Sequence, residues 1–296
     1  MPGSSPVTSR PVTSRPFTRR HFLIGSGATA AGLALYSGEI ARHEIDLISQ
    51  TLPIANLPTA FQGFRIAQIS DIHLEEFTEP FFLERVVHHV NALAADMVLL
   101  TGDFVTHGSL SFMVGQRAAH RCAEILSTLT CPLRYACLGN HDTAVGAPLV
   151  ISSLTSNGIP VLVDQHVPIE RNGSRFWLCG VNDPGTTNPR LDIAVPPQPN
   201  APVILMAHEP DYADAVLEHP RGKLVDVMLA GHTHGGQVRL PFLGALILPP
   251  MGKNYVEGHF QLEHMQLYVN RGIGTVGVPF RLNCPPEITI FTLQSA

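Results

Sequence analysis

Five short stretches of the chain carry side chains of the types that bind metal ions. They are Asp71-Ile-His73, Gly102-Asp103, Gly139-Asn-His-Asp142, His208 and Gly231-His-Thr-His234. Imidazole nitrogens combined with carboxylate and amide oxygens are the usual donors in metal hydrolases. No single stretch is specific, but the ordered set predicts a site for two metal ions of the kind that hydrolyses phosphoesters.

Most of these stretches follow an apolar run that is typical of a buried strand. The runs are Phe64–Ser70, Met97–Thr101, Leu133–Leu138, Val203–Ala207 and Val225–Ala230. In an open α/β sheet, ligands bind in the crevice beyond the carboxyl ends of the strands. We therefore expect segments that are far apart in the sequence to bring their polar ends to one place.

Spacing within the stretches suggests how each side chain would act. Asp71 and His73 are two residues apart, as are His232 and His234, so each pair can point to one side of an extended segment. The two oxygens of Asp103 can bridge two cations, and Asn140 offers a neutral amide oxygen. His141 can donate a proton to a leaving group or stabilise its charge. We expect Asp142 to hold that imidazole protonated.

Strands and helices alternate through the first half of the body, which predicts parallel strands with right-handed crossovers. Helices are expected at about 80–95, 112–129 and 147–157. Three short strands are expected at 159–163, 167–171 and 175–181, and two more at 267–270 and 288–293. Residues 182–202 contain six prolines, which predicts a long loop at the rim of the site.

Composition limits the class of protein. The chain has 296 residues, 45% of them hydrophobic and 15% charged, with 25 Gly and 25 Pro, which is typical of a loop-rich globular protein. Residues 1–38 contain four arginines and no acid, so the remainder carries 15 basic and 24 acidic residues, or −9. This acidic body argues against nucleic acid as a partner.

The amino terminus resembles a twin-arginine export signal. A basic leader, predicted to be unstructured, covers residues 1–17, and Arg19-Arg20 precede an apolar run to about Tyr36. That run is short for a bilayer span. We expect export, with the protein at the outer face of the cytoplasmic membrane or in the periplasm and in peripheral contact with the membrane. Signal cleavage near Ser37 and retention as an anchor both remain open.

The five cysteines form no Cys-x-x-Cys pair and lie outside the ligand stretches. Cys137 and Cys179 fall in apolar runs, where a thiol behaves as a small hydrophobic group. Buried structural thiols are therefore expected, although one disulfide stays open.

Residues 64–294 resemble the calcineurin-like metallophosphoesterase family. The ligand stretches carry this resemblance together with Gly231–Gln237, Asn270–Gly274, Arg281 and Pro286-Glu287. It implies an α/β fold, a four-layer αββα sandwich of two mixed sheets flanked by helices. The later motifs resemble an exported or membrane-associated phosphodiesterase branch, some of whose members cleave UDP-2,3-diacylglucosamine. The expected organisation is a leader at 1–38, a connector with the first strand at 39–63, and the enzyme domain at 64–296.

The resemblance also implies a ligand set. Two divalent ions, Mn²⁺, Fe or Zn²⁺, would share Asp103 and a bridging hydroxide, and His141 would be the proton donor. The first ion would bind Asp71, His73, Asp103 and His234. The second would bind Asp103, Asn140, His208 and His232.

Two positions depart from the family pattern. Thr106 stands where many members have an acid, which is not a direct metal ligand. Leu138 stands where protein phosphatases of this fold have an arginine that grips phosphate, which disfavours a protein substrate. The leading interpretation is a phosphodiesterase or pyrophosphatase for a small or lipid-linked substrate. A phosphomonoesterase or nucleotidase is the alternative, and a non-catalytic binding module is disfavoured because all seven ligands and His141 are present.

Overall fold

Apolar strands from distant parts of the chain form two sheets in a computed structural model that describes residues 18–108 and 112–296. The first sheet has five strands in the order β1-β13-β2-β3-β4. Their bounds are Asp46–Ile54 (β1), Glu287–Ser295 (β13), Arg65–Ile69 (β2), Met97–Thr101 (β3) and Arg134–Cys137 (β4). β2, β3 and β4 are parallel, as the alternating pattern predicts, whereas β13 runs antiparallel to β2.

The second sheet has six strands in the order β11-β12-β8-β7-β6-β5. Their bounds are Gly258–Leu262 (β11), Met265–Val269 (β12), Val227–Ala230 (β8), Val203–Met206 (β7), Ser174–Gly180 (β6) and Gln165–Arg171 (β5). The four central strands are parallel and both outer strands are antiparallel to their neighbours. A separate two-stranded hairpin joins β9 (Arg239–Leu240) to β10 (Gly244–Ala245).

Helices cover the outer face of each sheet, which gives the expected αββα order of layers. The first sheet is covered by α2 (Pro80–Ala92), α3 (Phe112–Leu126) and α4 (Asn140–Ser156), and the second by α5 (Leu191–Ala194) and α6 (Tyr212–Glu218). Alternation along β3 shows how one strand serves two layers. Met97 and Leu99 pack between the sheets, while Val98 and Leu100 pack beneath the helices.

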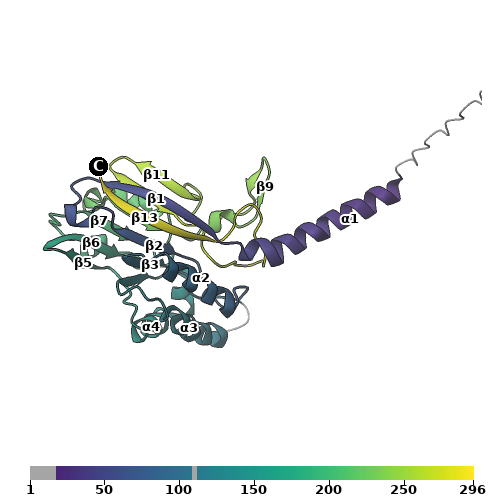
Figure 1. Ribbon diagram of the computed structural model, residues 1–296, viewed down its shortest axis with the longest axis horizontal. Helices are drawn as coiled ribbons and strands as arrows, with labels where there is room; N and C mark the ends of the chain where they lie inside the picture. The colour runs from purple at the N-terminus through teal and green to yellow at the C-terminus, as the bar shows by residue number, and fades with distance from the viewer. Residues whose placement is uncertain (1–17, 109–111) are drawn as a thin grey trace, which may run out of the picture.

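Before the sheets, α1 (Arg19–Leu35) projects from the body and buries no residue (Figure 1). One turn of π-helix (Tyr36–Ile40) and one of 3₁₀-helix (Ala41–His43) lead from it to β1. No helix in the described part of the chain is both long and apolar enough to span a membrane. The basic leader at 1–17 lies outside the described residues.

Two expectations about local structure differ from what is observed. The helix expected from Ala147 begins at Asn140, with a break at Gly146, whose φ of 137° is not helical. Of the strand expected at 159–163, the described contacts give only an isolated bridge between Val161 and Ala136. The cysteines agree with the expectation of buried thiols, since all five are unpaired and Cys131 alone among them is not fully buried.

The space between the sheets is filled mainly by aliphatic side chains, and several aromatic rings, Phe176 among them, pack with these. The Phe176 ring is fully buried and meets Phe61 and Phe64 edge to face, with centroids 4.9 and 5.8 Å away. Phe176→Ala should reduce the free energy of unfolding by about 3–5 kcal/mol, since it removes a large buried side chain and leaves a cavity. Urea denaturation measures this, and the matched change at exposed Phe81 should cost under about 1 kcal/mol. Equal losses would show that the sheets do not depend on this contact.

Candidate metal centre

All seven predicted ligands lie at the end of the sandwich where the parallel strands of both sheets finish. Asp71 and His73 follow β2, Asp103 follows β3, and Asn140 begins α4 immediately after β4. From the second sheet, His208 follows β7, and His232 and His234 follow β8. The structure therefore brings together residues from five separate segments and from both sheets.

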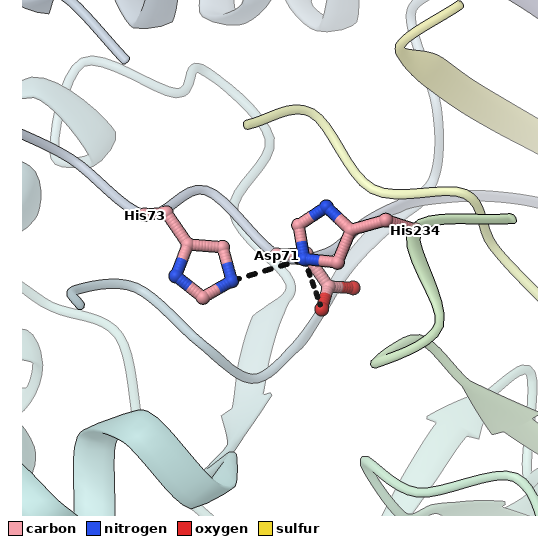
Figure 2. A group of neighbouring side chains, drawn as sticks. All are labelled: Asp71, His73 and His234. Carbon is pink, nitrogen blue, oxygen red and sulfur yellow. Dashed lines mark hydrogen bonds and ion pairs between the residues drawn. The ribbon is translucent and has the colours of Figure 1, made fainter. Parts of the chain in front are cut away.

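Asp71, His73 and His234 form one group of donors (Figure 2). Nε2 of His234 lies 3.1 Å from Nε2 of His73 and 3.4 Å from Oδ1 of Asp71. The three ligand atoms lie within 4.8 Å of one another. Two imidazole nitrogens and a carboxylate oxygen therefore face a common point, and all three residues are buried.

Asp103, His208 and His232 form a second group. Nε2 of His208 lies 3.1 Å from Oδ2 of Asp103. The same Oδ2 lies 3.5 Å from Nε2 of His73 in the first group. Asp103 therefore stands between the two groups, as a carboxylate shared by two cations must.

The donor atoms fit a pair of metal ions. Oδ1 of Asn140 is buried and has no hydrogen-bond partner in the described part of the structure, which is costly for an amide oxygen that faces no cation. The ring nitrogens that face away from the centre are held by the protein. Nδ1 of His208 lies 2.7 Å from the Thr101 carbonyl, and Nε2 of His232 lies 2.7 Å from the Pro250 carbonyl. Such outer contacts orient an imidazole for metal binding.

Electrostatics prepare most of the imidazoles for the same task. Burial lowers the pKa of His73, His232 and His234, and nearby Arg281 lowers that of His234 further. These rings are therefore neutral at pH 7 and offer a lone pair. Burial would also lower the pKa of His208, but the carboxylates of Asp103 and Asp71 raise it well above its usual value. Protonation of His208 would offset part of the negative charge of these two carboxylates.

Five of the seven proposed ligands have a strained backbone. Asp71, His73, Asp103, His232 and His234 have φ between 48° and 73°, in the left-handed region that non-glycine residues rarely adopt. Close approach explains two of the glycines. A Cβ on Gly139 would lie 2.2 Å from Oδ1 of Asp103, and one on Gly231 would lie 2.3 Å from Oδ2 of Asp71.

His141 lines the same cavity but lies beside the ligands. Its Nδ1 accepts a hydrogen bond of 3.0 Å from the backbone N–H of His107. The proton of the neutral ring is therefore on Nε2, the nitrogen that remains to donate. Its own backbone N–H donates to Oδ1 of Asp103 at 2.9 Å.

We expected Asp142 to hold the His141 ring, but its carboxylate is used differently. Its oxygens accept hydrogen bonds from the backbone N–H groups of Asp103, Phe104 and Gly139 at 2.8–3.0 Å. Burial and the neighbouring Asp103 carboxylate raise the pKa of Asp142 to about 8. The contacts make Asp142 a positioning residue, since it ties the loop of Asp103 to the start of α4.

The sequence does not show the role of two residues that lie next to the ligand histidines. Oγ1 of Thr106 lies 2.9 Å from Nδ1 of His73, so the residue that departs from the family pattern still serves a ligand. Arg281 is fully buried and donates to the carbonyls of Gly272 and Gly274, while Nδ1 of His234 lies 3.2 Å from that of Gly274. The sequence singled out Thr106 and Arg281 only through the family resemblance.

An open cavity of about 620 Å³ leads to the centre. Its floor is polar and includes His73, Asp103, Asn140, His141 and both histidines of the His232–His234 stretch. Its walls are apolar and come from residues 236–250 and 276–278. The rim expected from residues 182–202 is therefore supplied by two other segments.

Two groups of candidate metal donors at the strand ends of an αββα sandwich, with Asp103 lying between them, are the site expected of a metal-dependent hydrolase. The family model for calcineurin-like phosphoesterases matches residues 64–236. The chain belongs to this family, whose members hydrolyse phosphoester bonds with divalent metals.

Relatives cover nearly the whole chain. It is 32% identical to an uncharacterized metallophosphoesterase, YkuE, of Bacillus subtilis, over 92% of this chain and 94% of that one. It is 33% identical to phosphodiesterase YaeI of Escherichia coli, over 90% and 96%. Identity to the UDP-2,3-diacylglucosamine pyrophosphatase LpxG of Chlamydia trachomatis is 27%, over 79% and 86%. Among solved structures, a 5′-nucleotidase precursor from Thermus thermophilus aligns over 77% of this chain and 54% of its own, with 16% identity and a TM-score of 0.45.

Thr106→Val should weaken metal binding, because it keeps the shape of the side chain but removes the group that bonds to Nδ1 of His73. Loss of such an outer contact typically lowers metal affinity about 10- to 100-fold. Titration of metal-free protein with Mn²⁺, followed by calorimetry, measures the effect. Thr106→Ser keeps the hydroxyl and serves as the matched control. Equal affinities for the two variants would show that the contact does not orient His73.

Proposed function

We propose that the protein is a phosphodiesterase or pyrophosphatase with a dinuclear metal centre. The position of Asp103 between the two groups of donors carries this proposal. Its Oδ2 is 3.5 Å from a ring nitrogen of one group and 3.1 Å from a ring nitrogen of the other. The names of two relatives, a phosphodiesterase and a lipid pyrophosphatase, support the same bond type.

Each ion would have four protein ligands. Asp71, His73, Asp103 and His234 would hold the first, and Asp103, Asn140, His208 and His232 the second. Mixed nitrogen and oxygen donors suit Mn²⁺, Fe and Zn²⁺ alike. Such a pair would supply positive charge for the phosphoryl oxygens and would activate water as a nucleophile at neutral pH.

His141 would act on the leaving group. Because the His107 amide occupies Nδ1, the ring presents the hydrogen on Nε2 to the cavity. There it can bond to the oxygen that leaves phosphorus and supply its proton. Asp142 would contribute by fixing the loops on either side of this ring.

The cavity walls favour a substrate with an apolar part. Leu246, Ile247, Val276 and Val278 line the approach to the centre, a surface that suits an alkyl or acyl chain better than a second phosphate. A lipid-linked pyrophosphate such as UDP-2,3-diacylglucosamine is therefore the proposed substrate class. Leu138 at the position of the phosphatase arginine supports this choice over a phosphoprotein.

Turnover of bis-p-nitrophenyl phosphate tests the reaction class. Metal-free protein should be inactive, and added Mn²⁺ should restore hydrolysis. Asp103→Asn should bind both ions more weakly, because it removes the charge that the two sites share. A higher kcat/KM for p-nitrophenyl phosphate than for the diester would instead identify a phosphomonoesterase or nucleotidase. No turnover with any divalent metal would contradict the proposal and point to a binding module.

His141→Ala should separate chemistry from metal binding. Metal content and thermal stability should stay close to those of the parent, since His141 belongs to neither proposed ligand set. The rate should fall by roughly 10²–10⁴, the usual effect of losing a general acid. The fall should be smaller for esters of p-nitrophenol, whose leaving group needs little protonation, than for alkyl esters. Equal losses on both esters, or loss of a metal ion, would assign His141 another role.

We further propose export by the twin-arginine machinery to the outer face of the cytoplasmic membrane or the periplasm. Arg19 and Arg20 begin α1, which buries no residue and is thus accessible to a receptor. Replacing both arginines by lysine should leave the protein in the cytoplasm, because the pair is recognised by shape as well as charge. Cell fractionation measures this, and replacement of Arg42 and Arg65 by lysine is the control. Normal export of the double variant at 19 and 20 would contradict the proposal.

A further inference from the structure

The hairpin beside the cavity exposes an unusual concentration of apolar side chains. We name residues 241–251 the apolar tip. Phe242 is fully exposed, Ile247 is 82% exposed and Leu243 is 74% exposed, and Leu246 and Met251 are exposed too. No charged residue occurs between Arg239 and Lys253. A contiguous exposed patch of this kind marks a contact surface.

The tip stands on a fixed stem. Arg239 at its base forms an ion pair with Glu257, and its backbone N–H donates to the Leu282 carbonyl at 2.9 Å. On the far side, the Asp211 carboxylate accepts hydrogen bonds from the backbone N–H groups of Lys253 and Asn254 at 2.9–3.0 Å. The stem therefore presents the apolar side chains in a defined direction.

The tip is continuous with the mouth of the cavity. Leu246 and Ile247 are exposed to solvent and also line the cavity that leads to the metal centre. Whatever covers the outer side of the tip thus lies next to the entrance used by the substrate.

Helix α1 leaves the body close to the same entrance. The backbone N–H of Arg281 donates to the Ser37 carbonyl at 3.0 Å, and the next residue, Leu282, pairs with the foot of the hairpin. Figure 1 shows the β9 hairpin rising from the body near the point where α1 departs. Phe22, Leu23 and Ile24 of α1 are exposed as well, and α1 contains no acidic residue.

We propose that the apolar tip inserts into the interface of a lipid bilayer and holds the mouth of the cavity at the membrane surface. The tip protrudes, which suits a deformable lipid surface better than a rigid groove. It also carries no acid, whereas the body has a net charge of −9 after residue 38 and would be repelled by anionic lipids. Phe242 and Leu243 would enter the bilayer, and Ile247 would lie at the boundary.

Sedimentation with vesicles tests this inference, and it requires no turnover. The full chain should bind vesicles of phosphatidylcholine, with or without phosphatidylglycerol. Phe242→Ser combined with Leu243→Ser should lower the partition coefficient at least about tenfold, because both apolar side chains leave the bilayer. Neither side chain lines the cavity, so hydrolysis of a soluble diester should be unchanged.

Phe81→Ser combined with Ile193→Ser is the matched control, because these apolar side chains are also exposed but lie on α2 and α5. Its partition coefficient should equal that of the parent. Since α1 is identical in all three proteins, the difference isolates the tip. Equal binding by both double variants, or no vesicle binding by the parent, would overturn the inference.

Two further measurements identify what covers the tip. Brominated lipids should quench the tryptophan fluorescence of the Phe242→Trp variant more than that of the parent. The parent fluorescence comes from Trp177 alone and supplies the background. Absence of additional quenching would contradict insertion. Analytical ultracentrifugation addresses a second copy of the chain as the occupant. If the parent is a dimer, the variant changed at 242 and 243 is a monomer, and neither binds vesicles, then the tip contacts a second copy of the chain and the inference is wrong.

Discussion

The burial of Asp71 and Asp103 between two sheets is the constraint on which the site depends. A carboxylate without water needs donors or cations close by, and here each accepts a backbone N–H from a neighbouring ligand stretch. The amide of His232 donates to Asp71, and that of His141 donates to Asp103. These contacts are short because Gly231 and Gly139 carry no side chain. The left-handed turns at the ligands follow from the same need, since the chain must bend sharply to aim both an amide and a ring inward.

The strands that carry the ligands could be predicted from the sequence, because each is indicated by a local run of apolar residues. β3 occupies Met97–Thr101, as its apolar run indicates, and β7 and β8 differ from the predicted strands by one and two residues. Motifs that follow such strands must lie close together, since parallel strands end at the same edge of a sheet. The sequence alone therefore predicts that Asp71, Asp103 and His208 lie near each other.

What could not be predicted depends on contacts between segments that have no pattern of their own. Asp142 adjoins His141 in the sequence, yet its carboxylate reaches the amides of another loop. The sequence does not indicate the first turn of α4, because Gly146 and Pro148 are typical of a helix boundary. In the structure the Asp142 carboxylate accepts a hydrogen bond from the Gly139 backbone N–H and caps a turn that starts at Asn140. Prolines predict that residues 182–202 form a loop, but they do not show whether that loop borders the cavity. Packing of the 236–250 segment decides that question.

The position of β13 affects when the site can form during synthesis. This strand is the last in the chain but lies inside the first sheet, between β1 and β2. Its first residue, Glu287, bonds to the Gly272 carbonyl and to Tyr268, and Gly272 packs directly against Asp71. In a nascent chain that has not reached Glu287, the contacts that support Asp71 are not yet formed. All seven proposed ligand residues have by then been translated. Assembly of the centre therefore requires synthesis of β13, and a chain terminated before Glu287 would compete poorly for metal.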